Sequence, residues 1–248
     1  MKISVITATY NSKKTIIDNI ESVQKQNYNN VEHIIIDGKS TDGTIKILEF
    51  YKSSLKYVSE HDQGCYDAFN KGINLASGDI IAILNSDDVF FDHEVLSKVE
   101  KVFTQTDADI VYGNAVIVKK DNLYSVIRYW KSSKFLPNSF IKNSWHPPHT
   151  SFFVRKSIYE EYGKYDASLT IAADFELMLR FMEVNNLKSE YLDLYLTRMR
   201  VGGKSQKIKN IIKGFFEIKK SFKINGIDIN LLKYFAKRYY LKINQFFI

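Results

Sequence analysis

The stretch Ser77-Gly-Asp-Ile-Ile-Ala-Ile-Leu-Asn-Ser-Asp-Asp88 decides how this chain folds. Its apolar run, Ile80 to Leu84, has the length and the β-branched composition of a buried strand. Two neighbouring carboxylates, Asp87 and Asp88, follow the run, so the strand would deliver both of them to one edge of a sheet. The alternative is that the two acids only cap a helix after Phe91.

Strands and helices alternate around this stretch through the first 112 residues. We expect strands at residues 2–8, 31–36, 55–59 and 79–84, and helices with apolar stripes at 16–23, 45–51, 66–73 and 93–103. This alternation implies right-handed crossovers and a mostly parallel sheet that helices cover on both faces. Ligands of such sheets gather at the carboxyl ends of the strands, where this chain places clusters of polar residues.

The second half of the chain is less regular. A strand is expected at 110–118, a Lys- and Ser-rich irregular stretch at 119–144, and a strand with a short helix after His149. Residues 172–182 have the amphipathic pattern of a helix. We therefore expect a compact domain over 1–205, made of one half at 1–112 and another at 113–205, followed by a tail at 206–248.

Composition excludes several classes of protein. The 248 residues are 45% hydrophobic and 25% charged, which fits a globular domain and excludes intrinsic disorder, collagen and coiled coil. A single cysteine, Cys65, cannot form a disulfide framework or a cysteine-rich zinc site. The chain has no apolar run near the roughly 18 residues that span a bilayer, and its start lacks a signal peptide's apolar region. These features predict a cytoplasmic location.

The motifs favour chemistry on a diphosphate. The chain contains no Gly-x-Gly-x-x-Gly, no P-loop, no His-x-x-x-His pair and no Gly-x-Ser-x-Gly, which weakens dinucleotide, NTPase, zinc-hydrolase and serine-hydrolase interpretations. The carboxylates of Asp87 and Asp88 are hard ligands that suit Mg²⁺ or Mn²⁺. A departing diphosphate needs such a cation to stabilise its developing charge.

Five motifs in order carry a family resemblance. They are Thr-Ala-Thr-Tyr-Asn at 7–11, Ile-Asp-Gly-Lys-Ser-Thr-Asp-Gly-Thr at 36–44, Asp-Gln-Gly-Cys-Tyr-Asp-Ala-Phe-Asn-Lys-Gly at 62–72, the stretch at 77–88, and Ala-Ala-Asp-Phe-Glu-Leu at 172–177. Together they resemble family 2 glycosyltransferases, and are most similar to the branch that assembles bacterial O-antigen and capsular polysaccharides. The resemblance covers residues 2–205 and leaves the tail outside.

The resemblance implies a GT-A fold, a nucleotide-sugar donor that is most often a UDP-sugar, a Mn²⁺ or Mg²⁺ ion, and inversion at the anomeric carbon. It implies that the donor pocket is formed by Thr7, Thr9, Asn11, Asp37, Asp67, Lys71 and Asp87. Within this set Asp37 would read the uracil or ribose, and Asp67 and Lys71 would face the nucleotide or diphosphate. Asp87 and Asp88 match the metal-binding element, with Asp88 favoured as the direct ligand.

The remaining candidates lie in the second half. Asp174 matches the catalytic base of the family, although an acid at this position could also just cap the helix that it begins. His149, Arg200 and Ser205 match positions on the acceptor or diphosphate side, although His149 could simply bond backbone and Gly202-Gly203 could be an ordinary turn.

Two positions depart from the pattern of many relatives. Asp37-Gly38-Lys39-Ser40 stands where they have Asp-Asp-Gly-Ser, so one nucleotide-contacting carboxylate is missing, and Asn85 replaces the first acid of the metal motif. Both departures are typical of the O-antigen branch. We therefore expect an inverting glycosyltransferase that moves a sugar to a hydroxyl of a polyprenyl-diphosphate-linked saccharide. The alternative is a non-catalytic nucleotide-sugar or glycan-binding module on the same fold.

The basic character of the chain belongs to its tail. From Lys204 to Ile248, eleven Lys and Arg residues stand against two acidic residues, whereas residues 1–203 hold 24 basic and 26 acidic residues. Aromatic residues and lysines alternate at helical spacing there, which is typical of helices that lie on anionic bilayers. The tail thus predicts a peripheral protein on the inner face of the cytoplasmic membrane. A helix that packs on the domain is the alternative; nucleic acid is not expected as a partner.

Overall fold

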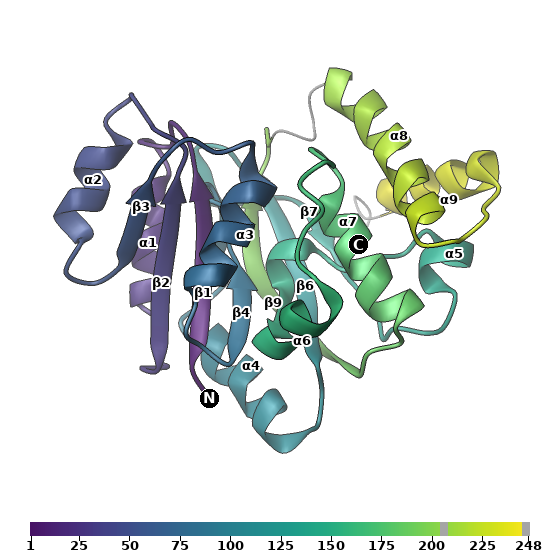
Figure 1. The fold of residues 1–248 in the computed structure, drawn as a ribbon, viewed down its shortest axis with the longest axis horizontal. Helices are drawn as coiled ribbons and strands as arrows, with labels where there is room; N and C mark the ends of the chain where they lie inside the picture. The colour runs from purple at the N-terminus through teal and green to yellow at the C-terminus, as the bar shows by residue number, and fades with distance from the viewer. Residues whose placement is uncertain (204–207, 245–248) are drawn as a thin grey trace.

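Parallel strands form the first half of the sheet, as the alternation of elements predicted (Figure 1). The structure is a computed structural model, and it describes residues 1–203 and 208–244. Strand β1 (Ile3–Thr9) lies between β2 (Val31–Asp37) and β4 (Ile80–Ile83), and β3 (Lys56–Ser59) pairs with the outer edge of β2. All three pairings are parallel, so these strands end at the same edge of the sheet.

Helices cover both faces of this half, because each carries one apolar stripe. They are α1 (Ile16–Gln24), α2 (Thr44–Tyr51), α3 (Cys65–Leu75) and α4 (Val95–Gln105). On one face, Phe69 and Ile73 of α3 belong to the same buried cluster as Ile6 of β1. On the other, Val99 of α4 is buried with Val5. The burial of this apolar surface fixes the positions of the loops that follow β1, β2 and β4.

The second half adds antiparallel pairings to the sheet. Strand β8 (Phe152–Arg155) is antiparallel to β4 and to β6 (Ile110–Lys119), while β9 (Ser189–Arg200) is parallel to β6 and antiparallel to the short β5 (Val89–Phe90). Among the described residues the sheet has nine strands in the order β3-β2-β1-β4-β8-β6-β9-β5, with β7 (Asn122–Trp130) on the free part of the β6 edge.

Three of these strands differ from the sequence-based expectation. The stretch 119–144, expected to be irregular, includes β7, and neither β9 nor the two-residue β5 was predicted. Exposed and partly buried residues mix along β7, because the strand forms a hairpin with β6 and turns one side to solvent. In β9, Glu190, Asp193 and Leu194 are exposed, while Leu196 and Thr197 are buried. Half-exposed strands of this kind lack a continuous apolar run.

Short helices complete the second half. These are α5 (Ser139–Asn143), α6 (Lys156–Tyr162) and α7 (Ala173–Met178), which continues as a π-helix (Leu179–Val184). The helix expected over 172–182 is therefore present, and its residues Leu177, Met178 and Phe181 are all buried.

The C-terminal helices pack on the second half of the domain. Helices α8 (Ile208–Ile224) and α9 (Leu231–Asn244) lie beside α7 and α5 (Figure 1). Ile218, Phe222 and Tyr234 are buried in the same cluster as Phe175 of α7. The described helices include none that is both long and apolar enough to cross a bilayer. The tail thus uses one face of each helix for packing. Ser205, a predicted site residue, lies outside the described residues.

Candidate active site

Three loops meet at the carboxyl edge of the parallel strands. The backbone N–H of Asn11, after β1, donates to the Ser40 hydroxyl after β2 (2.8 Å), and the Asn11 Oδ1 accepts from the backbone of Thr41 (2.8 Å). The hydroxyls of Ser12 and Ser86 lie 2.9 Å apart and join the same rim to the loop after β4. Asn11, predicted in the donor pocket, thus ties two of the loops together from an exposed position.

The loop after β4 carries two acids in different environments. Asp88 is 2% exposed, and its two carboxylate oxygens accept from the backbone N–H of Arg200 (3.0 Å) and from the Asn85 amide (2.9 Å). Asp87 is only partly buried. Burial raises the pKa of Asp87, and burial together with the charge of Asp87 raises that of Asp88 well above its usual range. The sequence favoured Asp88 as the direct metal ligand, whereas the structure makes Asp87 the more accessible of the two.

A buried polar chain holds this loop from below. The amide of Asn19 donates to the backbone oxygens of Asn85 (2.8 Å) and Asp88 (3.1 Å). Its Oδ1 accepts from the Thr7 hydroxyl (3.3 Å), which lies 3.0 Å from Nε2 of His33. Thr7 is fully buried. Its hydroxyl supports the loop that carries the acids, and the expectation that Thr7 lines the donor pocket stays a prediction.

His33 is held neutral in this chain. Burial lowers its pKa to about 3, and its Nδ1 has no hydrogen-bond partner in the part of the chain that the structure describes. The proton therefore sits on Nε2, from which it is donated to Thr7, and Thr7 donates in turn to Asn19. The hydrogen bonds therefore run in one direction, from His33 through Thr7 to Asn19, whose amide donates to the loop after β4.

Arg200 also supports that loop. Its Nη1 donates to the backbone oxygen of Asp87 (2.6 Å), its Nε donates to the backbone oxygen of Lys120 (3.1 Å), and its Nη2 pairs with Asp18. The residue is 8% exposed. Arg200 was expected on the acceptor or diphosphate side; the structure instead commits its guanidinium to backbone oxygens and to Asp18, close to the predicted metal ligands.

Asp174 stands at the start of α7 with one oxygen fixed and the other facing a histidine. Its Oδ1 accepts from the Tyr66 hydroxyl (3.1 Å) and from the backbone N–H of Phe175 (2.8 Å), and its Oδ2 lies 3.4 Å from Nδ1 of His149. Burial, and then the charge of Asp174, raise the pKa of Tyr66 well above its usual value, so the hydroxyl remains a donor. Tyr66 was not among the predicted site residues, because its helical spacing indicated a core position.

His149 connects the two groups of acids. Its Nε2 lies 2.9 Å from the Asn85 amide nitrogen, which also donates to Asp88. With Nε2 accepting from Asn85, Nδ1 carries the proton that faces Asp174. The side chains of His149 and Asp174 are 23% and 24% exposed, so both can be reached from outside. The chain Asp88–Asn85–His149–Asp174 thus brings three predicted site residues together in one place.

Asp37, at the predicted nucleotide end, shapes the turn after β2. It is fully buried, and its carboxylate accepts from the backbone N–H of Ser40 (3.0 Å) and from the hydroxyls of Ser40 and Ser59 (2.7 Å for Ser59). These bonds hold the turn, and the expectation that Asp37 reads the uracil or ribose stays a prediction.

A different carboxylate lies where the motif lacks one. A Cβ atom added to Gly38 would lie 2.6 Å from Oδ2 of Asp62 and 3.4 Å from the ring of Tyr10. Asp62 Oδ1 accepts from the backbone N–H of Gly64 (2.9 Å), which fixes the orientation of the carboxylate. Asp62 therefore fills the space of a side chain at position 38. Sequence reasoning missed it, although it begins the quoted motif at 62–72.

Thr9 and the exposed Tyr10 border the same place. Thr9 is 4% exposed, its backbone oxygen accepts from Gly38 (2.9 Å), and its hydroxyl oxygen lacks a partner within residues 1–203 and 208–244. Tyr10 is 62% exposed, which leaves its ring face open for stacking. The placement of Thr9 is compatible with its predicted role, which stays a prediction.

Asp67 and Lys71 hold the segment that carries Asp62. Asp67 accepts from the backbone N–H of Gln63 (3.1 Å) and pairs with Lys71 (3.3 Å). Lys71 also donates to the backbone oxygen of His61 (2.9 Å) and pairs with Glu60 (2.9 Å). Both side chains remain partly exposed, so a contact with a nucleotide stays a prediction, while their observed contacts stabilise the loop at 60–64.

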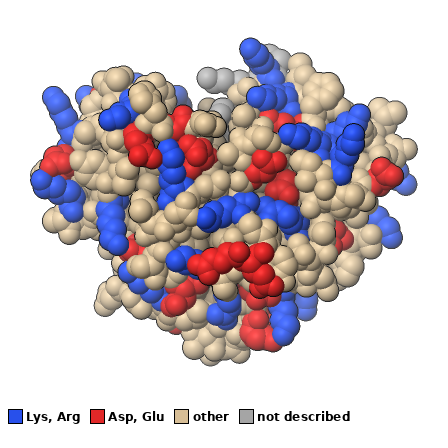
Figure 2. All heavy atoms as spheres, viewed as in Figure 1, with Lys and Arg blue, Asp and Glu red and all other residues tan. Residues whose placement is uncertain are grey.

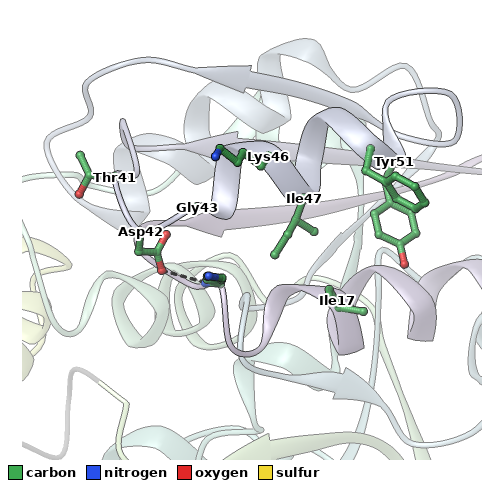
Figure 3. Close-up of a pocket in the computed structure, with 9 residues that line it drawn as sticks. Ile17, Thr41, Asp42, Gly43, Lys46, Ile47 and Tyr51 are labelled. Atoms are coloured by element: carbon green, nitrogen blue, oxygen red, sulfur yellow. Dashed lines mark hydrogen bonds between the residues drawn. The ribbon is translucent and has the colours of Figure 1, made fainter.

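A cavity of about 590 Å³ lies apart from these residues, between α1 and α2 (Figure 3). Its wall includes Ile17, Lys46 and Tyr51, and Asp42 at its rim accepts from the backbone N–H of Lys13 (3.0 Å). None of the predicted site residues lines it. We assign the cavity no part in the chemistry, because its lining residues include neither the candidate base nor the candidate metal ligands.

The carboxylate oxygens of Asp87 and Asp88 are ligands that fit Mg²⁺ or Mn²⁺. Within the described parts of the chain, three or more His, Cys, Asp or Glu side chains nowhere gather in a metal-binding cluster. Asp87 and Asp88 supply adjacent hard oxygens. Mg²⁺ and Mn²⁺ bind through one or two carboxylates and complete their shells with water and substrate phosphates, so they suit this arrangement.

Comparisons with known sequences agree with the motifs. The family model "Glycosyl transferase family 2" matches residues 4–163. The uncharacterized glycosyltransferase Rv1514c of Mycobacterium tuberculosis is 33% identical over 181 residues, which are 72% of this chain and 68% of that protein. UDP-Glc:alpha-D-GlcNAc-diphosphoundecaprenol beta-1,3-glucosyltransferase WfgD of Escherichia coli is 32% identical over 143 residues, which are 57% of this chain and 55% of that protein.

Solved structures show the same fold. TarS of S. aureus in complex with UDP has a TM-score of 0.66 at 20% identity, with 94% of this chain and 68% of that chain covered. Mannosyltransferase PcManGT of Pyrobaculum calidifontis in complex with GDP-Man and Mn²⁺ has a TM-score of 0.65 at 16% identity, with 90% and 67% covered. These likenesses confirm the GT-A type α/β fold that the motifs implied.

Proposed function

Because the chain belongs to glycosyltransferase family 2, we propose that it is an inverting, cation-dependent enzyme that transfers a sugar from a UDP-sugar to a lipid-linked acceptor. The acceptor class is a polyprenyl-diphosphate-linked saccharide of bacterial surface polysaccharide biosynthesis, O-antigen or capsule. WfgD, by its name, acts on such a lipid diphosphate, and TarS binds UDP, which supports both choices. The observation that carries the proposal is the row of contacts from Asp88 to Asp174: Asn85 is hydrogen-bonded to both Asp88 and His149, and Nδ1 of His149 lies 3.4 Å from Oδ2 of Asp174.

Asp174 is the proposed base. Its Oδ1 is occupied by Tyr66 and Phe175, so Oδ2 is the oxygen that takes the proton from the acceptor hydroxyl. The acceptor oxygen then attacks C1 of the sugar from the side opposite the diphosphate, which gives one inversion and no covalent intermediate. His149 Nδ1–H orients Oδ2. A cation bound by Asp87, backed by Asp88, would stabilise the charge on the leaving UDP.

The proposed division of the chain follows the geometry. Residues 1–112 supply the rim of loops for the nucleotide sugar and residues 113–205 supply Asp174 and His149 for the acceptor. The direct test is a panel of UDP-sugars with N-acetylglucosamine linked through diphosphate to an alkyl chain, scored by UDP release and product mass. Acceptor-dependent UDP release with a larger saccharide product supports the enzyme. UDP binding without release would support a non-catalytic binding module.

Asp62 is the residue proposed to recognise uracil. Its Oδ2 lies beside Gly38 and the open face of Tyr10, where it can accept the N3–H of the base while the ring stacks on Tyr10. In Asp62→Asn an amide nitrogen would replace Oδ2, so an N–H of the side chain would face the N3–H of uracil and neither could accept a hydrogen bond. We expect UDP affinity to fall about tenfold to a hundredfold, as measured by isothermal titration calorimetry.

The matched control for that change is Glu49→Gln. Glu49 lies on α2 and is half exposed, and its carboxylate pairs with Lys52 rather than with the loop at 60–64. It should leave UDP affinity close to that of the unmodified protein. Equal affinities of Asp62→Asn and the unmodified protein for UDP would remove Asp62 from base recognition.

The outer face of α8 supports the proposed site on the inner face of the cytoplasmic membrane. Ile211, Ile212 and Phe216 are each more than half exposed, and lysines flank them. Figure 2 shows Lys and Arg side chains gathered over the C-terminal helices at the upper right. Apolar side chains framed by cations are the pattern of helices that lie in the surface of an anionic bilayer. The packing and membrane interpretations of the tail are thus compatible, because they use opposite faces of α8.

Membrane binding can be tested on this face alone. The double change Ile212→Glu/Phe216→Glu should reduce co-sedimentation with vesicles of phosphatidylglycerol and phosphatidylethanolamine by at least about tenfold, since it removes apolar contact and adds repulsion. Phe50→Glu is the control, because Phe50 is 80% exposed on α2 at the opposite end of the molecule (Figure 1). Failure of the unmodified protein to bind these vesicles would contradict the membrane proposal.

A further inference from the structure

Glu217 of α8 accepts four hydrogen bonds from residues 170–172 and so joins the tail to the segment before α7. Its Oε1 accepts from the backbone N–H and the hydroxyl of Thr170 (3.0 and 3.1 Å). Its Oε2 accepts from the backbone N–H groups of Ile171 (2.7 Å) and Ala172 (2.9 Å). Glu217 is 6% exposed, so its charge is stabilised by these donors rather than by water.

The three residues that it holds lead directly into the proposed base. Ala172 is the N-cap of α7, and its methyl side chain cannot accept the hydrogen bonds that a cap usually takes. Asp174 follows in the first turn. Tyr66 donates to the backbone oxygen of Ile171 (2.9 Å) as well as to Asp174, so the same loop is fixed from both sides.

Helix α8 is shaped for this contact. The face that it buries carries Gly214, Glu217, Ile218, Ser221 and Phe222. A Cβ atom on Gly214 would lie only 3.2 Å from the Ile171 side chain, so the helix backbone approaches the loop closely. Phe222 packs on Phe175 with ring centroids 5.5 Å apart. Lys213, 3.9 Å from Oε1 and 52% exposed, adds only a screened attraction.

We propose that Glu217 is a positioning residue for Asp174, so that the C-terminal helices are part of the catalytic apparatus. The proposal rests on the assignment of Asp174 as the base. Glu217 touches no reacting atom; it fixes the N-terminus of α7 and thereby the direction of Oδ2. Its charge is needed, because four donors surround the carboxylate and an amide could accept from those on one side only.

Glu217→Gln tests the proposal with little change of shape. We expect kcat for transfer to fall about tenfold to a hundredfold, because a displaced base loses alignment with the acceptor hydroxyl. The KM for the donor should change by less than about twofold, since the nucleotide loops are untouched. Ser168→Ala is the control: it removes an exposed contact between the same loop and Lys220 of α8, and should keep kcat.

A merely structural role is separated by a double-mutant cycle. In the background of Asp174→Asn, Glu217→Gln should cause no further loss of the residual rate, because Glu217 acts through Asp174. The same fold-loss in both backgrounds, or an unchanged kcat, would overturn the proposal. The rates are compared at a temperature at which every variant is folded, so that a loss of rate does not report unfolding. If Glu217→Gln does not fold, Thr170→Val, which removes the hydroxyl bond alone, must still lower kcat without changing the donor KM.

The outcome also separates this inference from the proposed function. If Asp174→Asn retains full turnover, the base assignment fails whatever Glu217→Gln does. If Asp174→Asn abolishes transfer while Glu217→Gln leaves kcat intact, the glycosyltransferase mechanism stands and the role of Glu217 is wrong.

Discussion

Asp174→Asn should lower sugar transfer by about a thousandfold, the size of effect expected when a general base is removed. The amide keeps the shape of the side chain and can still accept from Tyr66 and Phe175 at Oδ1, so the start of α7 should be preserved. What is lost is an oxygen at Oδ2 that can take a proton. UDP release with an acceptor present measures the rate, and titration of UDP measures binding.

The control for this change is Asp166→Asn. Asp166 precedes Asp174 in the same segment, and its carboxylate accepts from the backbone N–H of Ser168 (2.9 Å) without contact to His149 or Tyr66. It should transfer sugar at the rate of the unmodified protein. UDP affinity should be similar in both variants. Turnover of Asp174→Asn within a few-fold of normal would remove this residue from the base role.

Asp87→Asn should have the second largest effect. Asp87 is the more accessible acid of the loop after β4. The change should therefore weaken the binding of the cation, and with it the stabilisation of the departing UDP. We expect transfer to fall at least about a hundredfold. The gain in UDP affinity on adding Mn²⁺ should also disappear, which isothermal titration with Mn²⁺ and with a chelator would show.

Asp92→Asn is the matched control for the metal site. Asp92 lies just beyond β5 and uses its carboxylate for the backbone N–H of Glu94 (2.8 Å) and for Lys98 (3.5 Å). Transfer and Mn²⁺ dependence should be unchanged in this variant. A Mn²⁺-dependent gain in UDP affinity that persists in Asp87→Asn would contradict the assignment of Asp87.

Much of the fold could be predicted because the first half follows simple periodicities. Residues 80–84 form a continuous apolar run and the stretch 31–36 ends in three isoleucines, and the two were found as β4 and β2. By contrast, β7 and β9 mix exposed residues, such as Tyr124 and Asp193, with buried or partly buried ones, and both strands pair with β6, which no local pattern reveals.

The site was predictable in its chemistry and less so in its geometry. Asp87, Asp88, His149 and Asp174 were indicated by their motifs, and the structure brings them to one place. Thr7 and Asp37 were expected at the donor, and the structure shows that both are fully buried and hydrogen-bonded within the protein, which their places at strand ends did not reveal. The proposed roles of Glu217 and Asp62 rest on contacts with distant segments, which the sequence cannot show.

In the proposed reaction, a single displacement transfers the sugar while Asp174 activates the acceptor on the side opposite the diphosphate. The configuration of the product tests this most directly, read from the anomeric proton coupling in the NMR spectrum after transfer from an α-linked UDP-sugar of gluco configuration. Single displacement gives a β-glycoside. An α-glycoside, with the configuration of the donor retained, would rule out single displacement.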